Sequence, residues 1–196
     1  QFNLDWEEFG AILKKTPPGN HAKIILPYFL PEIVPQVLNP KVYRFGFDED
    51  DMESNVRAII ECQFLSMRLH SRWIKEKPEI IYATGGASSN PDILQVMSDV
   101  FNTPVKRFEI SDSAALGAAI RSAKAFYDSV TLSKLWNELI DQYLTLQKSE
   151  IIYPNEDLKR LYDDMVELYK SYEDYVLKSG VNPKKQRQLF LDRYFN

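Results

Sequence analysis

The chain has 196 residues, of which 44% are hydrophobic and 27% are charged, so it can fold as one compact domain with its own core. Its formal net charge of -4 at pH 7 provides no polybasic surface, which argues against nucleic acid and membranes as partners. The only cysteine, Cys62, excludes an internal disulfide and a cysteine-based zinc cluster, as expected for a protein of the reducing cytoplasm.

The N-terminus carries no targeting signal that the sequence reveals. It lacks the basic start and apolar core of a signal peptide, and no apolar run approaches the roughly 20 residues of a membrane-spanning helix. The chain also lacks an initiator Met. We therefore expect that it begins within a longer protein or has been processed.

The first part of the chain is predicted to form one helix and two short strands. The helix spans about 5–14, and the strands span 23–29 and 42–47. Four prolines, at positions 27, 31, 35 and 40, forbid a regular helix or a central strand between the two strands.

A long helix is predicted at about 52–75. The acidic run 48–51 suits the positive end of this helix better than it suits a cation site. Cys62 lies in the apolar part of the helix and is predicted to be a small packed residue. Arg57 and Glu61 lie four residues apart, which predicts an ordinary ion pair within the helix and no catalytic role. His21 and His70 have no partner at metal or triad spacing, so we expect surface or boundary histidines.

A glycine-rich turn follows at 83–91, between the β-favouring run 79–82 and an amphipathic run at 92–101. Paired glycines, Gly85 and Gly86, let a ligand approach the backbone, and the free N–H groups of a helix start attract an anion. Ser89 or Asn90 can cap the helix, and Pro91 fits its first turn. This pattern is typical of a phosphate or nucleotide site, although many such turns only connect a strand to a helix.

The next segment completes a predicted βαβα unit. A short strand at 103–108 is followed by a helix whose start, 112–120, is rich in small residues. Small side chains at positions 114, 115, 117, 118 and 119 would let this helix lie close to the sheet or to the glycine loop. Tight helix packing alone would explain the same pattern.

The remainder of the chain, 128–196, is predicted to form helices packed on a domain at 1–127. One helix includes 132–143, and a third begins at 184–187. Between them, the apolar pattern at 158–176 predicts a second helix, for which Gly180 is the stop signal. Residues 151–155 are predicted to connect the first two. The helically spaced tyrosines Tyr162, Tyr169 and Tyr172 indicate a packing face and not a base-stacking platform.

Several of these motifs, in the same order, resemble the C-terminal nucleotide-binding domain of the FGGY carbohydrate kinases. The resemblance rests on 84–90, 93–101, 104–105 and 112–119, and it covers roughly 4–127. Segments 26–28, 32–35 and 56–63 are most similar to xylulose kinases of the eukaryotic type. The resemblance implies an α/β fold of the actin-like ATPase or ribonuclease-H-like kind, incomplete here and extended by C-terminal helices.

The resemblance also implies a reaction and a site. FGGY kinases transfer a phosphoryl group from MgATP to a sugar. Because the chain most resembles xylulose kinases, the implied sugar is the ketopentose D-xylulose and the implied product is xylulose 5-phosphate. The family's adenosine-binding loop carries over to Gly85, Gly86, Ala87 and Asn90, with Ser88 as a neighbour. Pro91 stands where the glycerol kinase pattern has a second Asn. The contact that this Asn makes in glycerol kinases is therefore not carried over to this chain.

No residue of this chain is expected to be the catalytic base or a metal ligand. In the family the base belongs to the N-terminal domain, and Asp5 lies in a different local pattern. We therefore expect a fragment that is inactive alone and that pairs with a missing N-terminal kinase domain. We also expect it to self-associate, because the face that the missing domain would normally cover is exposed. The alternative is a non-catalytic interaction module that retains the kinase fold.

Overall fold

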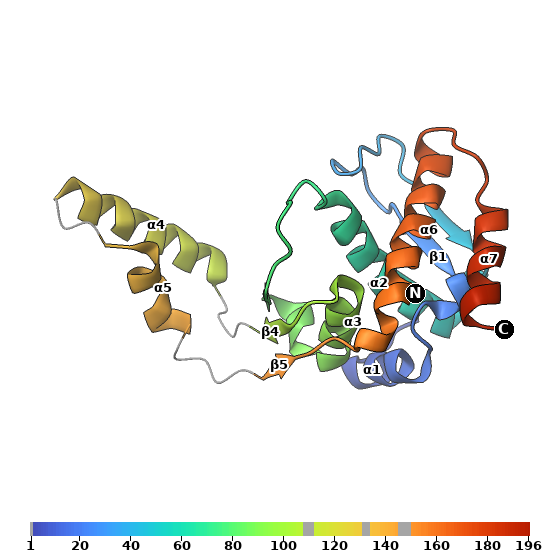
Figure 1. Cartoon of the computed structure of the whole chain (residues 1–196), viewed down its shortest axis with the longest axis horizontal. Helices are drawn as coiled ribbons and strands as arrows, with labels where there is room; N and C mark the ends of the chain where they lie inside the picture. Colours follow the sequence, from blue (N-terminus) through green and yellow to red (C-terminus); the bar gives the residue numbers. More distant parts are fainter. Residues whose placement is uncertain (1, 108–111, 131–133, 145–149) are drawn as a thin grey trace.

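The computed structural model describes residues 2–107, 112–130, 134–144 and 150–196. These residues form a body of helices and two small sheets, and a pair of helices that projects from it (Figure 1). The order along the chain is helix α1, strands β1 and β2, helix α2, strand β3, helix α3, strand β4, helices α4 and α5, strand β5, and helices α6 and α7.

The first sheet and its helices follow the predicted order. Helix α1 spans Trp6–Lys15, β1 spans Ile24–Pro27, β2 spans Val42–Phe45, and β1 and β2 pair antiparallel. Helix α2 spans Met52–His70 and is capped by Asp51, whose carboxylate accepts the Ser54 N–H. It ends before the predicted position 75, because residues 71–74 form a turn in which the Ile74 N–H binds the Ser71 carbonyl.

The second sheet contains the glycine loop. Strands β3 (Ile81–Ala83) and β4 (Val105–Arg107) are parallel, and α3 (Pro91–Phe101) connects them. The prediction that residues 151–155 only connect two helices is wrong in part, because Ile151–Ile152 form β5, which pairs antiparallel with β4. The edge of β4 offers unpaired backbone groups that this apolar pair can satisfy.

The core of the body surrounds α2. Helix α6 (Lys159–Leu177) packs on α2, and α7 (Lys184–Tyr194) packs on α6. Tyr162, Tyr169 and Tyr172 are all buried against α2 and the first sheet, which confirms that the helical tyrosines form a packing face. Cys62 is fully buried in the same core, as predicted for a small packed residue.

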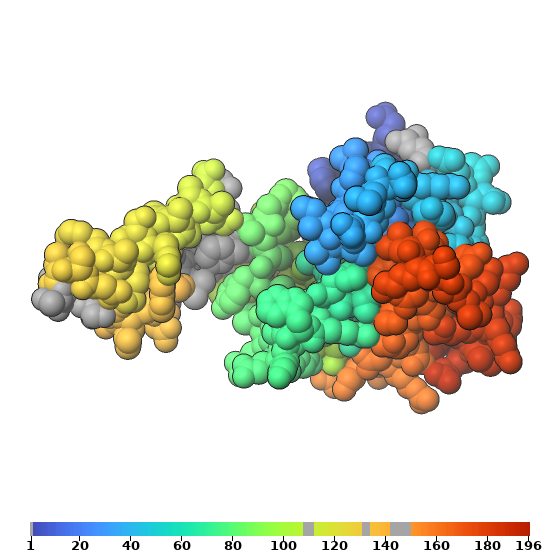
Figure 2. Space-filling view, turned by 90° about the horizontal axis from the view of Figure 1, so that it is seen from above, coloured from blue at the N-terminus to red at the C-terminus, as the bar shows by residue number. Residues whose placement is uncertain are grey.

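Helices α4 (Ser113–Ser129) and α5 (Trp136–Leu144) contact each other and stand apart from the body (Figures 1 and 2). No residue of α4 is buried, and a side chain at Gly117 would meet open space. Of the two expected positions for this helix, close to the sheet or close to the glycine loop, the first is therefore wrong, whereas the first residue of α4, Ser113, contacts the loop segment. Alanine and glycine side chains offer little apolar area, so they provide only a weak drive toward burial. Position 132 of the predicted helix lies outside the described residues.

Candidate functional site

The glycine loop joins β3 to α3 through a single turn of 3-10 helix, Gly86–Ser89. Gly85 has φ +95, a left-handed conformation that side chains disfavour. The hydroxyls of Ser88 and Ser89 donate to the carbonyls of Gly85 and Gly86, both at 2.7 Å. These bonds tie both hydroxyls to the loop's own backbone.

Helix α3 begins as the sequence predicts. The Asn90 side-chain oxygen accepts the backbone N–H groups of Asp92 and Ile93 at 2.9 and 3.2 Å, and Pro91 occupies the first turn. Asn90 also donates from Nδ2 to the Trp6 carbonyl of α1 at 3.3 Å. Asn90 is therefore buried and fixes the start of α3 against α1.

The predicted site residues are all in this one turn. A side chain built at Gly85 or Gly86 would meet nothing within 4 Å, so the backbone of both residues faces open space. Ala87 is exposed, whereas Ser88 and Asn90 are buried and serve the loop and the helix cap. The structure thus brings the five residues together, with the two glycines as the open part of the turn.

Helix α1 forms the wall opposite the loop, which sequence reasoning missed. A pocket of about 490 Å³ lies between Trp6, Gly10 and Lys14 on α1 and residues 89–92, which are the end of the loop and the first turn of α3. Gly85 and Gly86 do not line this pocket. A side chain at Gly10 would approach the Asp92 carboxylate to 2.6 Å, so this glycine lets the two helices meet closely. The only signal in the sequence was the spacing of Trp6 and Gly10, which puts an aromatic and a glycine on one helical face.

Two of the three charged side chains that line this pocket, Lys14 and Asp92, form an ion pair, and Glu7 is the third. Lys14 Nζ lies 3.4 Å from the Asp92 carboxylate, at the start of α3. A second hollow of about 750 Å³ opens on the other side of the loop, between α3 and the β4–β5 strands. The Thr84 hydroxyl donates to the Ser113 hydroxyl at 3.5 Å, so the start of α4 lies beside the loop.

Residues outside the loop have structural roles. Arg57 and Glu61 form a buried ion pair at 2.8 Å, as the spacing predicts. Asp5 caps α1 and belongs to a capping box with Glu8. His70 contacts the buried Glu173 at 3.0 Å, a partner that its sequence neighbourhood could not reveal.

The part of the chain that the structure describes contains no cluster of three or more His, Cys, Asp or Glu side chains that could hold a metal ion. Within the same residues, every helix is too short or too polar to cross a membrane.

Comparisons with known proteins agree on one family. Residues 3–126 match the C-terminal domain of the FGGY family of carbohydrate kinases. Xylulose kinase of Mus musculus is 30% identical over 191 residues, which cover 92% of this chain and 33% of the relative. Xylulose kinase 2 of Arabidopsis thaliana is 36% identical over 135 residues, covering 60% of this chain and 24% of the relative.

Solved structures show the same fold. Gluconate kinase from Lactobacillus acidophilus superposes with a TM-score of 0.73 at 21% identity, covering 90% of this chain and 35% of that chain. Xylulose kinase from Rhodospirillum rubrum gives a TM-score of 0.69 at 22% identity, covering 88% and 34%. The chain spans about a third of the length of the relatives it matches.

Proposed function

The chain belongs to the FGGY family of carbohydrate kinases, and from this premise we propose that it is the nucleotide-binding part of a kinase that transfers a phosphoryl group from ATP to D-xylulose. Its fold is then the second half of an actin-like, ribonuclease-H-like ATPase, with α6 and α7 as C-terminal additions. The single observation that carries the proposal is the open glycine turn that leads into α3, whose last residues, Ser89 and Asn90, line a pocket against α1.

This turn suits an adenine nucleotide. The bare backbone of Gly85 and Gly86 allows close approach of a ligand, because a Cβ would otherwise fill that space. The exposed Trp6 ring on the opposite wall offers an apolar face of the kind that nucleobases stack on. The loop residues 85–88 and 90 would hold the nucleoside, and the phosphates would extend beyond them.

The reaction divides between this chain and another part of the kinase. Phosphoryl transfer needs a positioned donor, neutralised phosphate charge, and a base for the acceptor hydroxyl. Asp5, whose carboxylate caps α1, is not free to be that base. The described residues contain no group of three or more His, Cys, Asp or Glu side chains that could hold a metal ion, and we propose none of them as a ligand of Mg²⁺.

The sugar is assigned from the relatives. The rodent and plant proteins with the matches reported above are xylulose kinases, whereas the solved neighbours of similar fold also include a gluconate kinase and a glycerol kinase. We therefore propose D-xylulose as the acceptor, which gives xylulose 5-phosphate. Comparing turnover of D-xylulose, gluconate and glycerol by the full-length kinase tests this choice.

The nucleotide site is tested by calorimetric titration of ADP into the wild-type chain and the Gly86→Val variant. We expect Gly86→Val to abolish ADP binding, because a branched side chain would occupy the space that the ligand needs. The fold should persist, since a Cβ at this position meets no atom within 4 Å. Trp6→Ala, on the opposite wall, should weaken binding as well.

Gly117→Val is the matched control, because this glycine also lies in open space but is on α4, outside the pocket. It should bind ADP like the wild type. Unchanged binding by Gly86→Val would remove the loop from the site and refute the proposal at its central observation.

The second candidate is a non-catalytic interaction module. One observation favours it: the loop between β1 and β2 exposes a group of large apolar side chains, Phe29, Leu30, Ile33, Val34 and Leu38. Such a patch is typical of a surface that another protein part covers. A wild-type chain that folds but binds neither ADP nor ATP would support this candidate over the kinase.

A further inference from the structure

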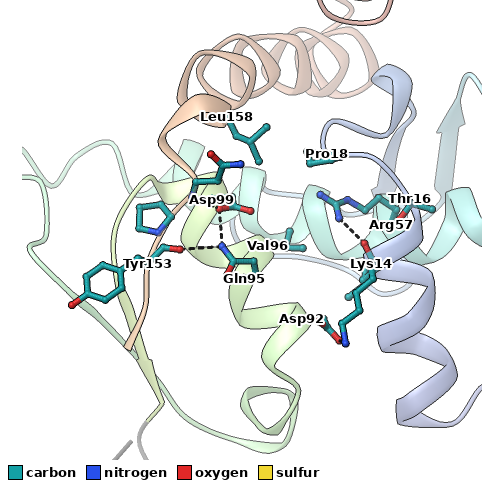
Figure 3. A pocket seen from close by; sticks show the side chains of 13 residues that line it. Lys14, Thr16, Pro18, Arg57, Asp92, Gln95, Val96, Asp99, Tyr153 and Leu158 are labelled. Carbon is teal, nitrogen blue, oxygen red and sulfur yellow. Dashed lines mark hydrogen bonds and ion pairs between the residues drawn. The ribbon is translucent and has the colours of Figure 1, made fainter. Parts of the chain in front are cut away.

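A second pocket of about 490 Å³ lies between α1, α3 and the segment 153–158 ahead of α6 (Figure 3). Its lining shares Lys14 and Asp92 with the proposed nucleotide pocket but contains no residue of the glycine-rich segment 83–90. Its apolar walls are formed by Leu13, Pro18, Val96, Pro154 and Leu158. This pocket therefore has room for a small organic molecule apart from the glycine loop.

One wall of this pocket carries a buried carboxylate with an unused oxygen. Asp99 is 6% exposed, and the bonds that it accepts from Gln95 Nε2 at 2.9 Å and from the Asn155 backbone N–H at 2.8 Å both end on Oδ1. Oδ2 can therefore accept bonds from a bound molecule. Burial raises the pKa of the Asp99 carboxyl, whereas the bonds from Asn155 and Gln95 and the positive Arg57 act in the opposite direction. A cation at Oδ2 would offset the cost of burying this charge.

The cations beside this carboxylate are already paired with other carboxylates. Lys14 forms an ion pair with Asp92 at 3.4 Å, and Arg57 forms one with Glu61 at 2.8 Å. Within the part of the chain that the structure describes, none of the ion pairs includes Asp99. These five side chains therefore carry a surplus of one negative charge, which is located on Asp99.

Gln95 supplies a second acceptor on the same wall. Its Nε2 donates to Asp99 Oδ1 and to the Tyr153 carbonyl at 3.1 Å, which uses both amide hydrogens. These two acceptors fix the orientation of the amide, because the amide oxygen could bind neither of them. Gln95 Oε1 is therefore left as an acceptor near the carboxylate. Two acceptors and a negative charge suit an ammonium group, which has three N–H donors.

The rest of the pocket indicates what the ammonium group is attached to. A bare metal ion is disfavoured, because the described residues include no group of three or more His, Cys, Asp or Glu side chains that could hold one. The apolar walls favour a hydrocarbon body. The Arg57 guanidinium lies on the wall opposite Asp99 (Figure 3), and it repels a second positive charge. The lining thus favours a monocation with an apolar body.

We propose that this pocket binds a primary monoamine, whose ammonium group donates to Asp99 Oδ2 and Gln95 Oε1 and whose hydrocarbon body packs against the apolar walls. The site goes beyond the proposed kinase function, because neither the nucleotide nor the phosphoryl acceptor is an amine.

The test is calorimetric titration of the 196-residue chain with pentylamine, with the neutral analogue pentanol and with cadaverine, a diamine of the same chain length. We expect pentylamine to bind about tenfold or more tightly than pentanol, because its bonds to the carboxylate are charge-assisted. Cadaverine should bind more weakly than pentylamine. Equal affinities for pentylamine and pentanol, no binding of pentylamine, or a preference for cadaverine would overturn the proposal.

One conservative variant localises the site. Asp99→Asn keeps an oxygen for the two bonds at Oδ1 but removes the charge and puts an N–H donor in place of Oδ2. It should weaken pentylamine binding about tenfold or more while leaving the affinity for pentanol unchanged, a selective loss that misfolding would not produce. Glu156→Gln is the matched control, because it removes one negative charge from an exposed residue outside the lining, and it should bind pentylamine normally. Melting curves report whether each variant is folded.

Pentylamine affinity that is unchanged in a folded Asp99→Asn chain would place the amine elsewhere and refute the site. If that variant does not fold, the comparison of pentylamine with pentanol on the wild-type chain decides. Gly86→Val should retain pentylamine affinity, because Gly86 does not line this pocket, so failure of the nucleotide site and failure of the amine site are distinguishable. A joint loss of ADP and pentylamine binding in a folded Gly86→Val chain would contradict two separate sites.

Discussion

At the scale of single residues, the most connected group is the buried set Arg57, Glu61 and Tyr162. The Tyr162 hydroxyl donates to Glu61 Oε1 at 2.8 Å, and the same oxygen accepts the Gly19 N–H. Burial acts to lower the pKa of Arg57, but the negative Glu61 holds it above its ordinary value. The group therefore ties α1, α2 and α6 together through charge-assisted bonds.

We predict that Tyr162→Phe lowers the free energy of unfolding by about 1–3 kcal/mol, because it leaves Arg57 and Glu61 short of a buried partner. Urea unfolding measures this change. Tyr172→Phe is the matched control: Tyr172 is equally buried and stacks on Phe45, so losing its hydroxyl should cost little. If both variants lost the same free energy of unfolding, the hydrogen bonds of the Tyr162 hydroxyl would add no stability beyond that of an ordinary buried tyrosine hydroxyl.

The Cys62 thiol gives a second prediction at this scale. Its sulfur is fully buried and accepts the Ile25 N–H at 3.4 Å, and burial raises the pKa of the thiol. Since the thiolate is the reactive form, the folded chain should not react with Ellman's reagent at pH 8. One equivalent should react after unfolding in urea. Rapid reaction of the folded chain would show that the core around α2 opens.

At the scale of elements, α4 and α5 are separable from the body. Lys106 and Ile151 are partners across β4 and β5, so Arg107 and Glu150 face each other where the arm leaves. An Asn-Gly turn in place of 108–149 would join these two strands as a tight hairpin. We predict that this shortened chain unfolds cooperatively, with a free energy within about 1 kcal/mol of the wild type.

Urea unfolding followed by circular dichroism measures the effect of this replacement. No residue of α4 is buried, and α5 packs mainly on α4, so the core should lose nothing. A chain that loses its cooperative transition would show that the arm stabilises the body.

Local sequence rules predicted the elements whose signals are local. Asn90, one of the two residues expected to cap α3, is its N-cap, and Pro91 occupies the first turn as predicted. The acidic run 48–51 precedes α2 as expected, and its last residue, Asp51, caps that helix. Partners distant in sequence could not be predicted. Helix periodicity does not reveal that Tyr162 binds Glu61, nor that β5 adds to β4, because both depend on tertiary packing.

The candidate site also has a part that local sequence could predict and a part that depends on tertiary packing. Residues 85–90 form one continuous motif, so sequence alone could propose them as a loop. The second wall, with Trp6 and Gly10, lies about 80 positions earlier and is brought to the loop only by the packing of α1 on α3. The pocket lined by Arg57 and Asp99 likewise combines residues of α1, α2, α3 and the segment 153–158 ahead of α6, which no single sequence motif contains.

At the scale of the whole molecule, we propose that this chain supplies the nucleotide side of a reaction whose other side lies elsewhere in the kinase. It spans about a third of the length of its relatives and matches the C-terminal domain of their family. The proposed nucleotide pocket is lined by two carboxylates, Glu7 and Asp92, and Asp92 is paired with Lys14. Binding of ADP and transfer of phosphate should therefore separate between this chain and the full kinase.

A coupled ADP-release assay with ATP, Mg²⁺ and D-xylulose tests this division most directly, on the 196-residue chain alone and on the same residues preceded by the N-terminal part of a xylulose kinase. The account predicts no turnover by the chain alone and turnover, abolished by Gly86→Val, when the N-terminal part is present. Turnover of D-xylulose by the chain alone would contradict the account, because it would place the catalytic base within these residues.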